Sequence, residues 1–121
     1  MRALVFIGMC VAPAIAAAPS ARAENPFDGR WNATLFTKSG PCQQSYRAEV
    51  QISAGIIRVP GDSQGALSGR VSPRGQVVVT GSLGPLSGVA TGRLSGNSGA
   101  GTWRAKIQEG SCSGQWSAQR Q

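Results

Sequence analysis

The sequence predicts an all-β protein: an antiparallel, up-and-down meander of about eight short strands that forms a small barrel, with a β-sandwich as the alternative. Three observations predict this class. A glycine-rich unit recurs at offsets of 23 and 22 residues, apolar and polar side chains alternate within it, and turn signals separate the alternating stretches. Nothing after residue 23 has the apolar spacing of a helix.

The repeat unit covers residues 65–72, 88–95 and 110–117, which align without gaps. A period of this length suits a strand, a turn, a returning strand and a second turn, so we expect each unit to belong to a β-hairpin. Because side chains alternate across a strand, the fifth residue of every unit falls on the buried face. These residues are Gly69, Gly92 and Gly114.

The remaining strands follow from alternation over Tyr46–Ser53 and from the β-branched run Gln76–Thr80. Pro- and Gly-containing turns such as Pro73-Arg74-Gly75 separate them. Closing the meander into a barrel leaves no exposed sheet edge. The expected strands lie near residues 30–37, 45–53, 55–59, 65–72, 76–82, 87–95, 100–107 and 111–120.

The N-terminus has the three regions of a secretory signal: a charge at Arg2, a short apolar run, and a small-residue end at Ala21-Arg22-Ala23. We therefore expect a signal peptide over residues 1–23, cleavage before Glu24, and a periplasmic or extracellular protein. A membrane anchor is less favoured because two prolines interrupt the run. Lipidation at Cys10 is also less favoured, because the preceding apolar run is short.

Residues 24–121 then form a single all-β domain of 98 residues, a size at which a core alone gives modest stability. This domain holds two cysteines, Cys42 and Cys112, and export places them where thiols oxidise. We expect one disulfide between them. The long loop that it closes predicts about 4 kcal/mol of stabilisation in the chain-entropy model.

Charge argues against a nucleic-acid partner. Removing Arg2 and Arg22 from the twelve Lys and Arg of the chain leaves ten, against five Asp and Glu, a net charge of +5. The arginines are spread one or two per strand and do not alternate with aromatic residues, so we expect a solvated surface. Weak attraction to anionic envelope polymers or lipid headgroups is the alternative.

Residue types missing from the chain argue against catalysis and cofactors. There is no histidine, so imidazole-based zinc, haem and general-base sites have no ligand or base. Tyr46 is the only conventional haem ligand left after processing. The five acids after residue 23 are far apart in sequence and match no paired-carboxylate or calcium motif. We expect a non-enzymatic protein with no metal or cofactor.

Two short motifs need a separate interpretation. The segment Gly61-Asp62-Ser63-Gln64-Gly65 matches the nucleophile-elbow pattern, but no helix is expected after it and no histidine can accept the proton. A Ser/Lys dyad with Lys38 or Lys106 is the catalytic alternative to a plain turn. The glycine-rich segment 96–101 offers backbone N–H groups to an anion, but a hairpin turn is the simpler interpretation.

The strand ends resemble a family signature. Gly29-Arg30-Trp31 heads the first strand and Arg120 ends the last, a pattern similar to that of the calycin superfamily of lipocalins, avidins and bacterial metalloprotease inhibitors. The resemblance implies that Gly29, Trp31 and Arg120 are structural, with Arg120 packed on Trp31 at one end of a barrel. The Ser-Gly-Arg units also resemble small exported bacterial proteins of unassigned activity.

Two functional hypotheses follow. The inward glycines leave room that either the protein's own aromatic residues or a small apolar ligand must fill. A binding module would use either the barrel mouth or the arginine-bearing outer face for such a ligand or for an envelope component, and it predicts a pocket lined by Trp103 or Trp116. The alternative, a protease inhibitor, predicts an exposed arm over residues 24–28 and a filled barrel. The candidate ligand-binding residues are Tyr46, Trp103, Trp116, Arg70 and Arg93.

Overall fold

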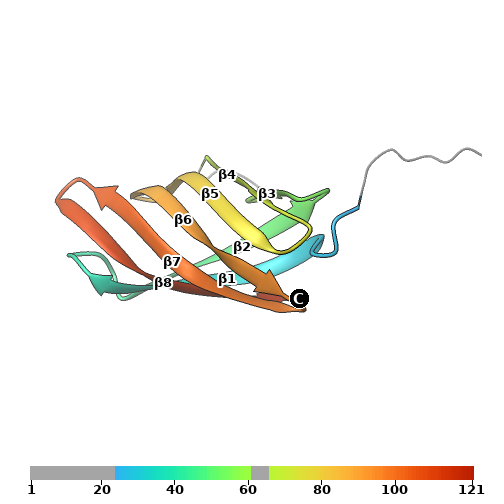
Figure 1. Cartoon of the computed structure of the whole chain (residues 1–121). Coiled ribbons are helices and arrows are strands. Elements are labelled where there is room, and N and C mark those ends of the chain that lie inside the picture. Colours follow the sequence, from blue (N-terminus) through green and yellow to red (C-terminus); the bar gives the residue numbers. More distant parts are fainter. Residues whose placement is uncertain (1–23, 61–65) are drawn as a thin grey trace, which may run out of the picture.

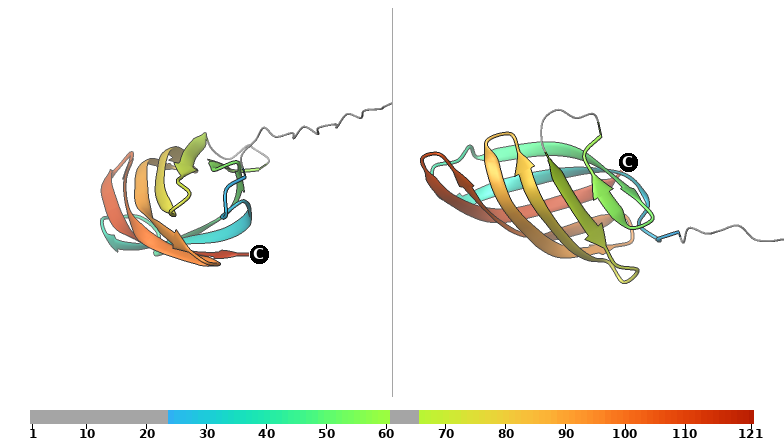
Figure 2. Two further views of the ribbon diagram at one scale, coloured as in Figure 1. Left: turned by 45° about the vertical axis from the view of Figure 1, so that its right-hand side comes forward. Right: turned by 90° about the horizontal axis from the view of Figure 1, so that it is seen from above.

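The computed structural model describes residues 24–60 and 66–121, which form a closed antiparallel barrel of eight strands in sequence order (Figures 1 and 2). The expected fold class is confirmed, and closure selects the barrel over the sandwich. The expected signal peptide over residues 1–23 and the elbow-like motif over residues 61–65 lie outside the described residues. The strands are β1 (Gly29–Ser39), β2 (Ser45–Ser53), β3 (Ile56–Arg58), β4 (Leu67–Val71), β5 (Gln76–Leu83), β6 (Leu86–Ser95), β7 (Ser98–Ile107) and β8 (Gly110–Arg120).

Barrel closure depends on β1, which pairs with β2 on one side and with β8 on the other. The β1–β8 register places Trp31 directly opposite Arg120. Every other neighbouring pair is a hairpin between consecutive strands, as expected for a meander. The strand limits differ from the expected ones by two residues or fewer, and the third strand is shorter than expected, with three residues.

The predicted inner face is confirmed. Leu67, Gly69 and Val71 alternate with exposed Ser68 and Arg70 along β4. The same alternation continues through β6 and β8, so the recurring unit corresponds to every second strand of the barrel. The buried side chains form a single apolar core that includes all three tryptophans.

The two ends of the barrel are built differently. At one end lie the N-terminal arm, the turns β2–β3, β4–β5 and β6–β7, and the C-terminus, which Figure 1 marks beside the start of β1. At the other end lie the hairpin turns β1–β2, β5–β6 and β7–β8. We call these the arm end and the hairpin end.

Candidate functional site

The interior of the barrel contains a cavity of about 120 Å³. All eight strands contribute to its wall, and almost all of the lining is apolar. The cavity reaches the hairpin end, because Leu83 and Leu86, on either side of the β5–β6 turn, belong to its lining. Its inward-facing side chains include Ala33, Leu35, Ala48, Val50, Ile52, Ile57, Leu67, Val77, Val79, Ala90, Trp103 and Trp116.

Trp116 extends from β8 across two neighbouring strands. Gly101 on β7 pairs with Trp116 and with Gly92 on β6, so the three residues form one row across the sheet. A Cβ atom on Gly92 would lie 2.6 Å from Cζ2 of Trp116, and one on Gly101 would lie 2.6 Å from its Nε1. The indole therefore occupies the space that two glycines leave open, a way of covering glycine in a curved sheet.

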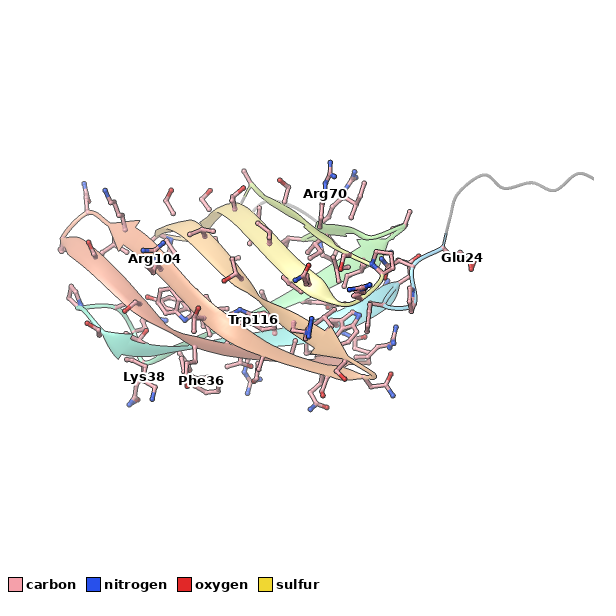
Figure 3. The ribbon with its side chains drawn as sticks, in the orientation of Figure 1. Glu24, Phe36, Lys38, Arg70, Arg104 and Trp116 are labelled. Carbon is pink, nitrogen blue, oxygen red and sulfur yellow. A yellow bond between two sulfur atoms is a disulfide. The ribbon has the colours of Figure 1, made fainter. Side chains whose placement is uncertain are left out.

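Trp103 extends in the opposite direction around the barrel. It starts on β7 and crosses Gly114 on β8, where an added Cβ would lie 3.0 Å from Nε1 of Trp103. The tryptophans therefore fill part of the space over the glycine row, and a cavity is left between them and the opposite wall. Figure 3 shows Trp116 inside the barrel.

The arm end of the cavity is closed by Trp31 and the N-terminal arm. Trp31 is 1% exposed and lines the cavity, and its Nε1 donates to the carbonyl oxygen of Phe27 at 2.9 Å. Phe27 is 7% exposed and belongs to the apolar core. Asn25 ties the arm to β4 through a 2.9 Å hydrogen bond from its side-chain amide to the carbonyl oxygen of Val71.

Arg120 connects the arm to the barrel. Its guanidinium lies over the Trp31 ring, 4.9 Å from the centroid, which is the arrangement that the calycin resemblance implied. Nη1 donates to the carbonyl oxygen of Asp28 at 2.8 Å, and Nη2 donates to that of Pro26 at 3.2 Å. Further donations reach the β6–β7 turn at Asn97 Oδ1 and the carbonyl oxygen of Gly96. One side chain thus links the arm, the first strand and a hairpin turn.

Asp28 organises the β2–β3 turn. Its carboxylate accepts hydrogen bonds from the backbone N–H groups of Ala54, Gly55 and Asn25. Ala54 and Gly55 both have positive φ, and for Ala54 this backbone conformation is unfavourable without support. Desolvation raises the pKa of Asp28, but the three hydrogen bonds and the charge of Arg120 together outweigh it, so its pKa lies below the ordinary value.

The predicted disulfide is confirmed between Cys42 and Cys112, whose Cα atoms are 6.2 Å apart. Cys42 lies in the β1–β2 loop and Cys112 near the start of β8, so the bond ties that loop to the wall at the hairpin end. Gly40 allows the close approach, because a Cβ there would lie 2.7 Å from Cα of Cys112. The hairpin end is therefore fixed covalently on the β1–β8 side.

The polar groups of the tryptophans are all occupied by the protein itself. Trp116 Nε1 donates to the carbonyl oxygen of Thr91 at 3.0 Å, and Trp103 Nε1 donates to that of Gln115 at 3.1 Å. Together with the Trp31–Phe27 bond, this leaves no indole N–H among the three free to bind a ligand. The cavity offers contact surface and shape, and the tryptophans add no spare hydrogen-bond donor.

The structure does not bring all of the candidate ligand-binding residues together. Trp103 and Trp116 line the cavity. Tyr46 does not, and its hydroxyl accepts a hydrogen bond from the Gln43 backbone N–H at 3.0 Å. Arg70 and Arg93 are exposed on the outer face of β4 and β6. The candidate residues therefore fall in different places: the two tryptophans inside, the two arginines on the outer face, and Tyr46 outside the cavity lining.

The arm expected for an inhibitor is held against the barrel. Phe27 is buried, Asn25 is hydrogen-bonded to β4, and the carbonyl groups of Pro26 and Asp28 accept from Arg120. Sequence reasoning missed Phe27 and Asp28 as parts of the barrel end. The one sequence signal for this role is that Phe27 is apolar and lies directly ahead of the strand that carries Trp31.

Residues 24–60 and 66–121 contain no cluster of three His, Cys, Asp or Glu side chains placed to hold a metal ion. The part of the chain that the structure describes also has no helix of the length and apolarity needed to cross a bilayer. In comparisons with known proteins, no family model, no curated protein and no solved structure matches this chain.

Proposed function

We propose that this protein is an exported, non-enzymatic binding module that holds a small apolar molecule inside its barrel. The observation that carries the proposal is the apolar cavity between Trp103, Trp116 and the β1–β2 wall. A concave site lined almost entirely by apolar side chains is the kind of site in which small apolar molecules bind.

Size limits the ligand. An engineered apolar cavity of about 150 Å³ in another protein holds one benzene molecule. The cavity here, about 120 Å³, suits a single ring or a short alkyl segment. A larger ligand would have to extend out at the hairpin end, past Leu83 and Leu86, because Trp31, which is 1% exposed, lines the cavity at the other end.

The apolar lining of the cavity also restricts the polarity of the ligand. A polar ligand would lose its hydrogen bonds to water on entering, and the indole N–H groups around it already donate to backbone carbonyl groups. An unpaired polar group buried in this way costs roughly 1–3 kcal/mol. The proposed ligand is therefore uncharged and apolar over the part that enters the cavity.

The barrel end supports a calycin-like assignment as part of this proposal. Trp31 follows Gly29 at the head of the first strand, and Arg120 from the last strand stacks on it. Calycins are barrels of this general kind, and the resemblance implies that the pair is structural. The disulfide is compatible with the proposed export, because such bonds persist in oxidising compartments.

A protease-inhibitor function receives less support. That mechanism requires a free arm, whereas residues 25–28 are bound to β4, to Trp31 and to Arg120. It also predicts a filled barrel, whereas a cavity is present.

The test is a tryptophan-fluorescence titration of the secreted chain with toluene and short alkanes. We expect saturable changes, because Trp103 and Trp116 line the cavity. Ala90→Leu adds bulk inside, between Val79 and Trp103, and should abolish the response, as should Ala48→Leu on the opposite wall. Ala100→Leu is the matched control, because Ala100 is exposed on the outer face of β7. A flat titration, or equal responses in all variants, would overturn the proposal.

A further inference from the structure

A basic and partly apolar patch covers the outer face of β3 to β6. It has four exposed arginines and two exposed aliphatic residues, whereas the other exposed residues of these strands are mostly Ser, Thr and Gln. The patch consists of Ile56, Arg58, Arg70, Arg74, Val78 and Arg93, and we call it the arginine patch.

Strand register places these side chains together. Arg70 on β4 pairs with Ile56 on β3 and with Val78 on β5, so one cation stands between two aliphatic side chains in a single row. Arg58 lies two residues along β3 from Ile56, on the same face.

The other two arginines extend the patch toward the arm end. Arg93 on β6 pairs with Gln76, and Arg74 lies in the β4–β5 turn that precedes Gln76. The Leu94 backbone N–H donates to the Gly75 carbonyl oxygen, which holds this turn beside β6. The patch is therefore continuous over neighbouring strands.

No salt bridge in the described part of the chain involves the patch. The carboxylate on a strand beside it is that of Glu49 on β2, two residues from Gln51, which pairs with Arg58. The single salt bridge found among residues 24–60 and 66–121 joins Arg30 to Glu49, outside the patch. The sequence from residue 63 to residue 108 contains no Asp or Glu. Four guanidinium groups thus face solvent with no carboxylate from β4, β5, β6 or β7 beside them.

The aliphatic side chains distinguish between anionic partners. Val78 is 53% exposed and Ile56 is 39% exposed, and both flank Arg70. A soluble polyanion would use the arginines and gain little from exposed aliphatic groups. At a bilayer surface the guanidinium groups can bind lipid phosphates while the aliphatic groups enter the headgroup region.

We propose that the arginine patch docks the barrel on the surface of an anionic lipid bilayer. The attractions of the four arginines to the bilayer surface add up, because each basic side chain near an anionic surface strengthens binding about fivefold. The inference does not depend on the cavity ligand, since the patch lies on the outside of the wall.

The test is co-sedimentation of the secreted chain with vesicles of phosphatidylcholine and phosphatidylglycerol in equal amounts, compared with phosphatidylcholine alone. We expect binding to the anionic vesicles only, weakened by added salt. Arg58→Gln with Arg70→Gln should weaken it about 25-fold, at about fivefold for each charge.

A charge-matched control separates the patch from net charge. Lys38→Gln removes one charge from β1, which lies two strands from β3, the nearest strand of the patch, and is compared with Arg70→Gln alone, which should weaken binding about fivefold. Figure 3 shows Lys38 and Arg70 on opposite sides of the barrel. The control should bind nearly as well as the unmodified chain, because charges more than about 10 Å from the membrane are screened at 0.1 M salt.

The aliphatic groups have a matched control as well. Val78→Ser should weaken vesicle binding severalfold, whereas Phe36→Ser should not, although Phe36 on β1 is 44% exposed. Three results would each overturn the proposal: no binding to anionic vesicles, equal losses in Lys38→Gln and Arg70→Gln, or equal affinity of the unmodified chain and Val78→Ser. The last result would show that the patch binds anions by charge alone.

Discussion

Replacing Arg120 with alanine should open the arm end of the barrel. The side chain makes four hydrogen bonds, to Pro26, Asp28, Gly96 and Asn97, and stacks on Trp31. Because the site is partly exposed, we take each bond at about 0.5 kcal/mol and the stacking at about 1 kcal/mol. The expected loss is about 3 kcal/mol, which lowers the Tm of a domain of this size by roughly 15 °C.

Urea unfolding followed by tryptophan fluorescence measures this loss, since Trp31 reports on the arm end directly. Arg120→Lys keeps the charge over Trp31 but cannot reach four dispersed acceptors, so we expect a loss of about 2 kcal/mol. Arg47→Ala is the control, an exposed arginine on β2, and should change stability by less than about 0.5 kcal/mol. The reasoning is refuted if Arg120→Ala costs no more than Arg47→Ala, or if Arg120→Lys matches the unmodified chain.

Three further predictions concern the turn, the disulfide and the glycine row. Because folding lowers the pKa of Asp28, its ionised carboxylate stabilises the fold above about pH 4, and this stabilisation is lost as the pH falls through the folded pKa. Urea unfolding at pH 7 and pH 3 measures the loss. In Asp28→Asn, the free energy of unfolding should differ less between the two pH values than in the unmodified chain. Replacing Cys42 and Cys112 by serine should cost about 4 kcal/mol, measured by thermal unfolding with and without reductant, and an unchanged Tm would contradict it. Gly101→Ala should lower the free energy of unfolding by at least about 2 kcal/mol and shift the fluorescence emission of Trp116, because the new Cβ meets the indole and the β6 backbone. An unshifted spectrum would contradict the placement of the Trp116 indole over Gly101.

The sequence was most informative where a local rule fixes geometry. Two-residue alternation placed Gly69, Gly92 and Gly114 inside and Arg70 and Arg93 outside. The candidate tryptophans and arginines therefore belong to opposite faces of the barrel wall, as strict alternation requires.

Other features depend on closure of the barrel and could not be predicted locally. Arg120 meets Asp28 across 92 residues of sequence, and Asp28 supports the Ala54–Gly55 turn from 26 and 27 residues away. Ala54 also lacks the usual signal for such a turn, because Asn or Gly is favoured where φ is positive. The cavity depends on which way Trp103 and Trp116 cross their neighbours, and this is decided by packing.

Binding inside the barrel is tested most directly by NMR titration of the isotopically labelled chain with benzene. We expect saturable shifts at cavity-lining residues such as Val79, Ala90 and the Trp116 indole, with intermolecular contacts between benzene and these groups. The same titration of Ala90→Leu should show none of them. Shifts confined to the exposed apolar residues Phe36, Ile56 and Val78 would contradict an interior site.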